Sequence, residues 1–294
     1  MTDNLILANK QDIIRIADAL RVKENVTTSY DWDTLIAKAI EAIGKKEETP
    51  ELLPAWKIPE YVKKEAVRVA NEVQAKLDKY GEGSVVFISL SDTHLNNDST
   101  TGVGYIAPRN ALMAAKILAY ALNIDFVIHT GDVTAGRAID TPDALKTQAT
   151  TVINMMKEAF NGFPIFCAIG NHDSGEYYDN ANGKVGTYMI EGEFLYNNFT
   201  MLCNPDESIA TNGGYCYKDF PNKNLRVFLL NTSESLVGRA TWPTSGADTW
   251  NAMSTAQLNQ FGTWFNNMPE GYKSIIVSHY PADFMANRIL GNKL

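Results

Sequence analysis

The stretch Gly170-Asn171-His172-Asp173 follows directly on Ile165-Phe166-Cys167-Ala168-Ile169, and this junction decides the fold. Five apolar residues in a row predict a buried strand. The residues after it offer an amide oxygen, an imidazole and a carboxylate, which are ligands that metal ions use in proteins. In open α/β sheets, ligands bind outside the carboxyl ends of the strands, so the junction predicts a functional site at that edge.

Three more groups of polar residues stand just after predicted strands. Asp92-Thr93-His94, Gly131-Asp132 and His279 each follow an apolar run of strand length. One such group is weak evidence, because Asp-x-His and Gly-Asp pairs occur often by chance. Four groups in this order, each at a strand end, indicate a hydrolytic site that gathers distant positions around two metal ions.

The predicted elements alternate between strands and helices over much of the chain. Strands are expected at 85–90, 126–128 and 165–169, and helices at 109–122 and from Thr141-Pro142 to about 160. A strand pair at 215–217 and 225–230, a helix at 254–266 and a strand at 274–277 follow. Strands that alternate with helices indicate βαβ units and the α/β class.

The first part of the chain has a different organisation. Residues 1–44 predict a small helical unit with two apolar stripes, and the charged, proline-bearing residues 45–58 predict a linker. Another helix is expected from Pro59, which suits a first helical turn, to Gly81, which ends it. Residues 59–294 are expected to form the catalytic domain, with that helix packed on it.

Composition limits the function. The chain has 294 residues, 45% of them hydrophobic, and a net charge of −8. This charge argues against general nucleic-acid binding, which needs a basic face, but bound metal ions would still attract a phosphate substrate. We expect no signal peptide and no membrane span, since the chain begins without a basic-then-apolar segment and has no apolar run long enough for a bilayer.

Some residues allow two interpretations. Cys167, Cys203 and Cys216 lack zinc-type spacing and imply no disulfide framework, and Cys167 is expected in the core. His129 fits a packed, hydrogen-bonded histidine better than a ligand. The aromatic residues of the segment 174–214 either line a substrate pocket or belong to a loop-and-helix insertion that packs on its own domain: Tyr177, Tyr178, Tyr188, Phe194 and Tyr196.

The pattern D-x-H, G-D, G-N-H-D and H, in this order, resembles the calcineurin-like metallophosphoesterases. The resemblance implies an α/β (α+β) fold, a four-layer αββα sandwich that starts near Val85 and follows the small N-terminal helical unit. It also implies a metal-dependent hydrolase of phosphomonoesters or phosphodiesters. The cofactors would be two divalent or trivalent transition-metal ions, Mn, Fe or Zn, because mixed oxygen and imidazole ligands suit these metals better than Ca²⁺.

The resemblance also implies a role for each motif residue. Asp92 and His94 would bind the first metal, Asp132 would bridge both, and Asn171 and His279 would bind the second. His172 would face the substrate and protonate the leaving group. Asp173 would hydrogen-bond His172, raise its pKa and fix its orientation.

One motif of the family has no counterpart. The family pattern closes with G-H-x-H, whereas the chain stops at Leu294, shortly after His279. We expect that the domain is C-terminally incomplete, that each metal then keeps three protein ligands, and that the 294-residue chain has low activity.

A second resemblance covers only residues 1–44. The segment Ile16-Ala17-Asp18-Ala19-Leu20-Arg21, a polar turn and a second helix resemble the start of phage and prophage tail or baseplate proteins. It implies docking on such proteins, so the chain would be either cytoplasmic or virion-associated. The alternative function is then a tail or baseplate component with a weakly active or inactive hydrolase domain. A generic helical hairpin is the other interpretation of residues 1–44.

Overall fold

The computed structural model of the chain describes residues 59–81, 83–96, 103–136, 142–175, 178–179, 184–185, 190–234 and 253–280. The predicted N-terminal helical unit and the linker lie outside these residues. The chain divides into two compact units, Met1–Val86 with Met113–Ile124, and Phe87–Leu112 with Asp125–Leu294. The residues of the predicted site all belong to the second unit.

Helix α3, Glu60–Tyr80, confirms the helix expected between Pro59 and Gly81. Gly81 has a φ of 91°, which glycine adopts without steric cost, and its N–H donates to the carbonyl of Leu77. Val62, Ala66 and Ala70, at helical spacing, are the buried residues of this helix. Among the described residues, no helix combines the length and hydrophobicity needed to cross a membrane.

The first sheet confirms the predicted βαβ arrangement. Its strands are β1, Phe87–Leu90, β2, Phe126–His129, and β3, Ile165–Cys167, and both pairings are parallel with β2 in the middle. Helices α4, Val103–Leu122, and α5, Pro142–Ala159, connect them. All four residues of β2 are buried, as expected for the central strand of a parallel sheet.

Helix α4 begins six residues before the predicted start at residue 109, and it contains Pro108. Proline lacks an N–H, so the carbonyl of Gly104 cannot receive the helical bond from that position. The N–H of Asn96 donates to this carbonyl instead, at 2.9 Å. A residue from the preceding loop therefore satisfies the carbonyl that Pro108 leaves open.

The second sheet has the order β6, Glu207–Ile209, β7, Tyr215–Phe220, β8, Leu225–Leu229, and β9, Lys273–Val277. Strands β6, β7 and β8 are antiparallel, whereas β8 and β9 are parallel and are connected through α7, Thr255–Asn266. The Ser254 side chain accepts from the N–H of Gln257 and caps α7. These elements confirm the predicted strand pair, helix and last strand.

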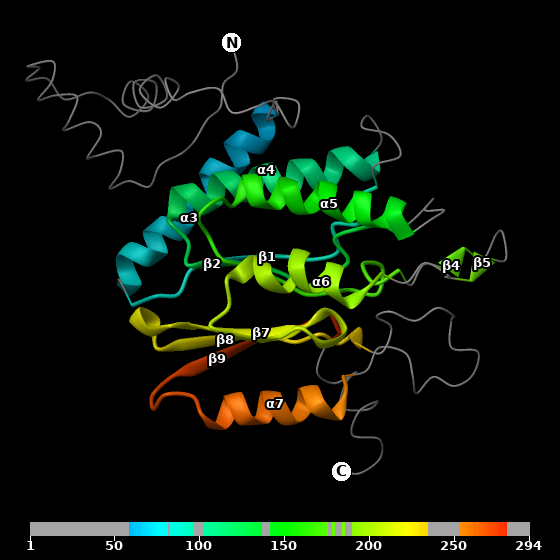
Figure 1. Ribbon diagram of the computed structural model, residues 1–294. Coiled ribbons are helices and arrows are strands. Elements are labelled where there is room, and N and C mark those ends of the chain that lie inside the picture. The colour runs from blue at the N-terminus through cyan, green and yellow to red at the C-terminus, as the bar shows by residue number, and fades with distance from the viewer. Residues whose placement is uncertain are drawn as a thin grey trace, which may run out of the picture. The chain divides into compact units, whose positions relative to one another are not determined.

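Aromatic side chains fill the spaces between the layers of the second unit. Phe220 of β7 contacts Phe126 and Phe166 of the first sheet, with ring centroids 5.0 and 6.2 Å apart. On the other face of the second sheet, Tyr217 contacts Trp264 of α7 and Phe228 contacts Phe261. Figure 1 shows the resulting order of α5, the first sheet, the second sheet and α7. The predicted mixed α/β fold with four layers is confirmed.

The segment after the third strand contains short elements. They are β4, Tyr178–Asp179, β5, Lys184–Val185, α6, Gly192–Asn198, and three 3₁₀ turns at Thr200–Cys203, Thr211–Gly213 and Pro221–Lys223. Tyr196 of α6 hydrogen-bonds Ser208, and the ammonium group of Lys146 lies over the Phe194 ring. These two aromatic residues pack on their own unit. The side chains of Tyr177, Tyr178 and Tyr188 lie outside the described residues.

Candidate metal centre

The strand register brings the predicted site residues to one edge. Leu90, His129 and Cys167 stand side by side at the carboxyl ends of β1, β2 and β3. The loops continue this parallel pairing beyond the strands, since the N–H of Asp92 donates to Gly131 at 3.2 Å and the N–H of His94 donates to Asp132 at 3.0 Å. The loops that carry the first two motifs therefore run in fixed register.

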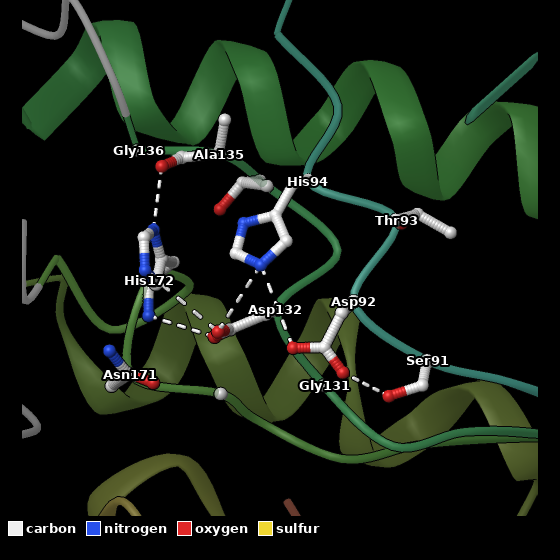
Figure 2. Close-up of polar contacts among 12 residues, drawn as sticks. Ser91, Asp92, Thr93, His94, Gly131, Asp132, Ala135, Gly136, Asn171 and His172 are labelled. Carbon is white, nitrogen blue, oxygen red and sulfur yellow. Dashed lines mark hydrogen bonds and ion pairs between the residues drawn. The ribbon is translucent and has the colours of Figure 1, made fainter. Parts of the chain in front are cut away.

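Asp132 is the centre of the cluster. Its Oδ2 atom lies 3.5 Å from Nε2 of His279, 3.8 Å from Nε2 of His94 and 3.9 Å from Nε2 of His172. Two ligands bound to one ion at about 2.1 Å each stand roughly 3–4 Å apart, so these separations fit metal coordination. Figure 2 shows His94 and His172 directed at Asp132.

Two further side chains complete two groups of three around Asp132. Oδ1 of Asp92 lies 3.6 Å from Nε2 of His94, and Oδ1 of Asn171 lies 3.0 Å from Nε2 of His279. Asp92 and His94 thus form one pair of possible ligands beside Asp132, and Asn171 and His279 form another. The structure brings together all five side chains that the sequence proposed as metal ligands.

The structure also places His172 within the cluster. Among the described residues, the ligand atoms of His94, Asp132 and His172 all lie within 4.8 Å of one another. Sequence reasoning assigned His172 to the substrate and not to a metal. Its Nε2 atom is nevertheless as close to Asp132 as that of His94, so geometry alone allows both roles.

The backbone is strained at this edge. Asp92, His94 and Asp132 have φ values of 48°, 44° and 52°. Every other described non-glycine residue with positive φ is an asparagine. Such strain costs about 1–3 kcal/mol per residue and is typical of functional sites.

Two glycines allow the motif loops to approach closely. Gly131 has a φ of 98°, and a Cβ atom there would lie 2.8 Å from Nδ1 of His279. A Cβ atom on Gly170 would overlap Oδ1 and the backbone nitrogen of Asp132. Both positions therefore require glycine for steric reasons, and both lie beside the Asp132 carboxylate.

Backbone carbonyls orient two histidine rings. Nδ1 of His279 lies 2.8 Å from the carbonyl oxygen of Thr130, and Nδ1 of His172 lies 2.6 Å from that of Ala135. A carbonyl oxygen only accepts, so each Nδ1 carries the proton and each Nε2 faces the cluster. In a neutral ring, that Nε2 has a free lone pair, as a metal ligand requires.

The predicted hydrogen bond between Asp173 and His172 stays a prediction, and the structure gives the Asp173 carboxylate other partners. The buried carboxylate of Asp173 accepts from the N–H groups of Val133, Thr134 and Gly170 and from the Thr134 hydroxyl, at 2.9 to 3.3 Å. These four bonds fill its acceptor sites. Burial, with a smaller contribution from the charge of Asp132, raises the pKa of Asp173 to about 6. Asp173 therefore joins two motif loops.

His129 is a packed, hydrogen-bonded histidine, as predicted. Its side chain is fully buried, and both ring nitrogens have partners within the protein, Thr93 and the N–H of Gly131. Burial lowers the pKa of His129 to about 3. Cys167 is buried in the core, also as predicted, and Cys203 and Cys216 are free thiols with sulfur atoms 3.5 Å apart.

Sequence reasoning missed two hydroxyl residues at the site. Thr130 donates to the Ser91 hydroxyl at 2.8 Å, and the Ser91 hydroxyl donates to Oδ2 of Asp92. Figure 2 shows the contact between Ser91 and Asp92. The available signal was position, since Ser91 precedes Asp92 and Thr130 precedes Gly131. Such partners orient a ligand without binding the metal themselves.

The chain is similar to one protein family and to a solved structure. The sequence profile of the family Metallophos, described as calcineurin-like phosphoesterase, matches residues 85–292. A solved structure of a dimetal phosphatase from Danio rerio is similar with a TM-score of 0.48 and 15% identity, over 67% of this chain and 70% of that chain. A comparison with curated proteins found no match.

Proposed function

The chain belongs to the calcineurin-like phosphoesterase family and is a phosphoesterase, and on that premise we propose that it holds two metal ions that share Asp132. Asp92, His94 and Asp132 hold one ion, and Asp132, Asn171 and His279 hold the other. The single observation that carries this proposal is the position of Asp132, whose Oδ2 lies 3.5 to 3.9 Å from three imidazole nitrogens.

The residues present fit such a centre. A carboxylate that serves two ions must lie near both groups of donors, and Oδ2 of Asp132 lies 3.8 Å from His94, the neighbour of Asp92, and 3.5 Å from His279, the neighbour of Asn171. When bound, the two cations neutralise the phosphate oxygens and activate a water molecule for attack. The mixture of carboxylate, amide and imidazole donors favours Mn, Fe or Zn.

We assign proton transfer to His172. The carbonyl of Ala135 holds Nδ1–H, so the proton that leaves or returns is the one at Nε2. A protonated Nε2 beside the Asp132 cluster is placed to donate to the oxygen of the leaving alcohol. Asp173 supports this role indirectly, because it accepts from the N–H groups of Thr134, which precedes Ala135, and of Gly170, two residues before His172.

The test is hydrolysis of p-nitrophenyl phosphate and bis(p-nitrophenyl) phosphate in excess Mn²⁺ and in EDTA. The two substrates separate monoesterase from diesterase activity. We expect hydrolysis that requires Mn²⁺ and disappears in Asp132→Asn. The control is Asp143→Asn, which changes a carboxylate that is 95% exposed on α5. Hydrolysis that persists in EDTA, or in Asp132→Asn, would overturn the proposal.

Docking on a phage tail or baseplate stays a prediction from the resemblance of residues 1–44, which lie outside the described residues. The phosphoesterase proposal does not depend on it, because every donor around Asp132 comes from residues 91–279.

A further inference from the structure

His129 has no part in the mechanism above, yet it ends β2 between the loops of the first two motifs. Its ring is fully buried, and its backbone pairs with Leu90 of β1 and Cys167 of β3. Burying an imidazole costs free energy unless both of its nitrogens find partners. The partners of His129 therefore show what the buried ring does.

The hydrogen bonds around this ring have one consistent direction. The N–H of Gly131 donates to Nδ1 of His129 at 3.2 Å, so Nδ1 carries no proton. The proton is then on Nε2, which donates to the Thr93 hydroxyl at 3.1 Å. Thr93 in turn donates to the carbonyl oxygen of Val133 at 3.2 Å. The His129 ring and the Thr93 hydroxyl thus connect the N–H of Gly131 to the carbonyl of Val133 by three hydrogen bonds in series.

Thr93 lies between two proposed ligands whose backbone is strained. Asp92 and His94 both have positive φ, and Figure 2 shows their side chains directed at Asp132 while the Thr93 side chain points away. Thr93 therefore holds the first motif loop, residues 92–94, by hydrogen bonds of its side chain to His129 and Val133. Its two bonds reach residues on either side of Asp132, namely Val133 directly and Gly131 through His129.

We propose that His129 and Thr93 are positioning residues that hold Asp92 and His94 in register with Asp132, so that the donors of one metal ion converge. This inference rests on the proposed metal centre. Without the anchor, the strained loop relaxes toward ordinary backbone angles, and the donor atoms separate. Partners behind a ligand typically change metal affinity by about 10–100-fold when they are lost.

The variants are Thr93→Val, which keeps the shape but removes both hydrogen bonds, and Thr93→Ser, which keeps the hydroxyl. The matched control is Thr200→Val, because the Thr200 hydroxyl likewise donates to a carbonyl, that of Gly213, away from the cluster; Thr200 is buried, whereas Thr93 is half-buried. Each metal-free protein is titrated with Mn²⁺ by calorimetry, and its Tm is measured in EDTA.

We expect Thr93→Val to weaken at least one Mn²⁺ binding step by about 10–100-fold. Thr93→Ser should restore the affinity, and Thr200→Val should lower the Tm without changing the affinity. Unchanged Mn²⁺ affinity in Thr93→Val, or an equal loss in Thr200→Val, would overturn the positioning role alone. A wild-type protein that binds no Mn²⁺ would overturn the proposed metal centre as well, so the two failures are distinguishable.

A second measurement needs neither metal nor activity. Nitrogen-15 NMR of the metal-free protein reports which ring nitrogen of His129 carries the proton. We expect a neutral ring protonated at Nε2 at neutral pH, with a changed Nε2 signal in Thr93→Val and a wild-type signal in Thr200→Val. A ring protonated at Nδ1 would contradict the link, because the N–H of Gly131 could not then donate to it.

Discussion

Nε2 of His279 lies 3.5 Å from Oδ2 of Asp132, although Asp132 follows β2 of one sheet and His279 follows β9 of the other. The cluster therefore requires both sheets of the second unit. The carbonyl of Thr130 holds the His279 ring from the first sheet, and the Thr232 hydroxyl accepts from the N–H of Tyr280 within the second. The site can form only when the two sheets are packed together.

Substitutions of the ligands should separate the two ions. His279→Ala should remove one ion per chain, because only one proposed group of donors contains it. Asp132→Asn should remove both, because an amide cannot bridge two cations as a carboxylate does. Elemental analysis after gel filtration measures the metal content. Equal losses in the two variants would show that Asp132 is not shared.

Gly170→Ala should destabilise the protein, because the new Cβ atom would overlap Asp132. Overpacking of this kind costs about 1–3 kcal/mol in the free energy of unfolding, which urea titration in EDTA measures. The matched control is Gly262→Ala within α7, where a Cβ atom meets nothing within 4 Å. Alanine favours a helix, so the control should gain about 0.5–1 kcal/mol. Equal stability of the two variants would contradict the close approach at Gly170.

His172→Ala should separate proton transfer from metal binding. If Nε2 protonates the leaving group, turnover should fall by about 10²–10⁴-fold while metal content stays at the wild-type level. The loss should be smaller for aryl than for alkyl phosphates, because an aryl leaving group needs little protonation. A matching loss of metal would instead identify His172 as a ligand, which its 3.9 Å distance from Asp132 also allows.

The metal-free protein should become less stable as the pH falls, because His129 is buried in its neutral form. Burial lowers its pKa to about 3, whereas an imidazole in the unfolded chain titrates near about 6.5. Between these two pH values, His129 binds a proton in the unfolded chain but not in the folded protein. Its contribution to the free energy of unfolding is therefore fully present above pH ~6.5 and is lost as the pH falls toward ~3. Between these pH values, the free energy of unfolding should fall by up to about 1.4 kcal/mol for each pH unit.

In His129→Asn, the free energy of unfolding should depend less steeply on pH than in the wild type. Urea unfolding at several pH values in EDTA measures this dependence. Asp173 has a raised pKa of about 6 and therefore contributes stability that is lost as the pH rises. This opposite contribution is present in both proteins and cancels in the comparison. Identical slopes would show that His129 titrates in the folded state much as it does in the unfolded chain.

The sequence predicted the elements that carry the site. Apolar runs identified β2, β7, β8 and β9, and the strand-helix alternation predicted the parallel sheet. Because parallel strands of one sheet end at one edge, the motifs after β1, β2 and β3 were expected to converge, and the ligand atoms of His94, Asp132 and His172 do lie together. This part was predictable because period and order along the chain are local properties.

The start of α4 and several hydrogen-bond partners at the site could not be predicted, because they depend on contacts between loops that are distant in the sequence. The early start of α4 requires the N–H of Asn96 to satisfy the Gly104 carbonyl. The bonds that the Asp173 carboxylate accepts were missed for the same reason, since they come from a loop some forty residues earlier in the chain. The link from His129 to Thr93 was likewise visible only after folding.

The central claim is that two metal ions share Asp132. The most direct test is anomalous diffraction from crystals of the protein grown with Mn²⁺. We predict two peaks, each about 2.1 Å from an oxygen of Asp132, one beside Asp92 and His94 and the other beside Asn171 and His279. A single peak that does not touch Asp132, or no peak within about 3 Å of its carboxylate, would contradict the account.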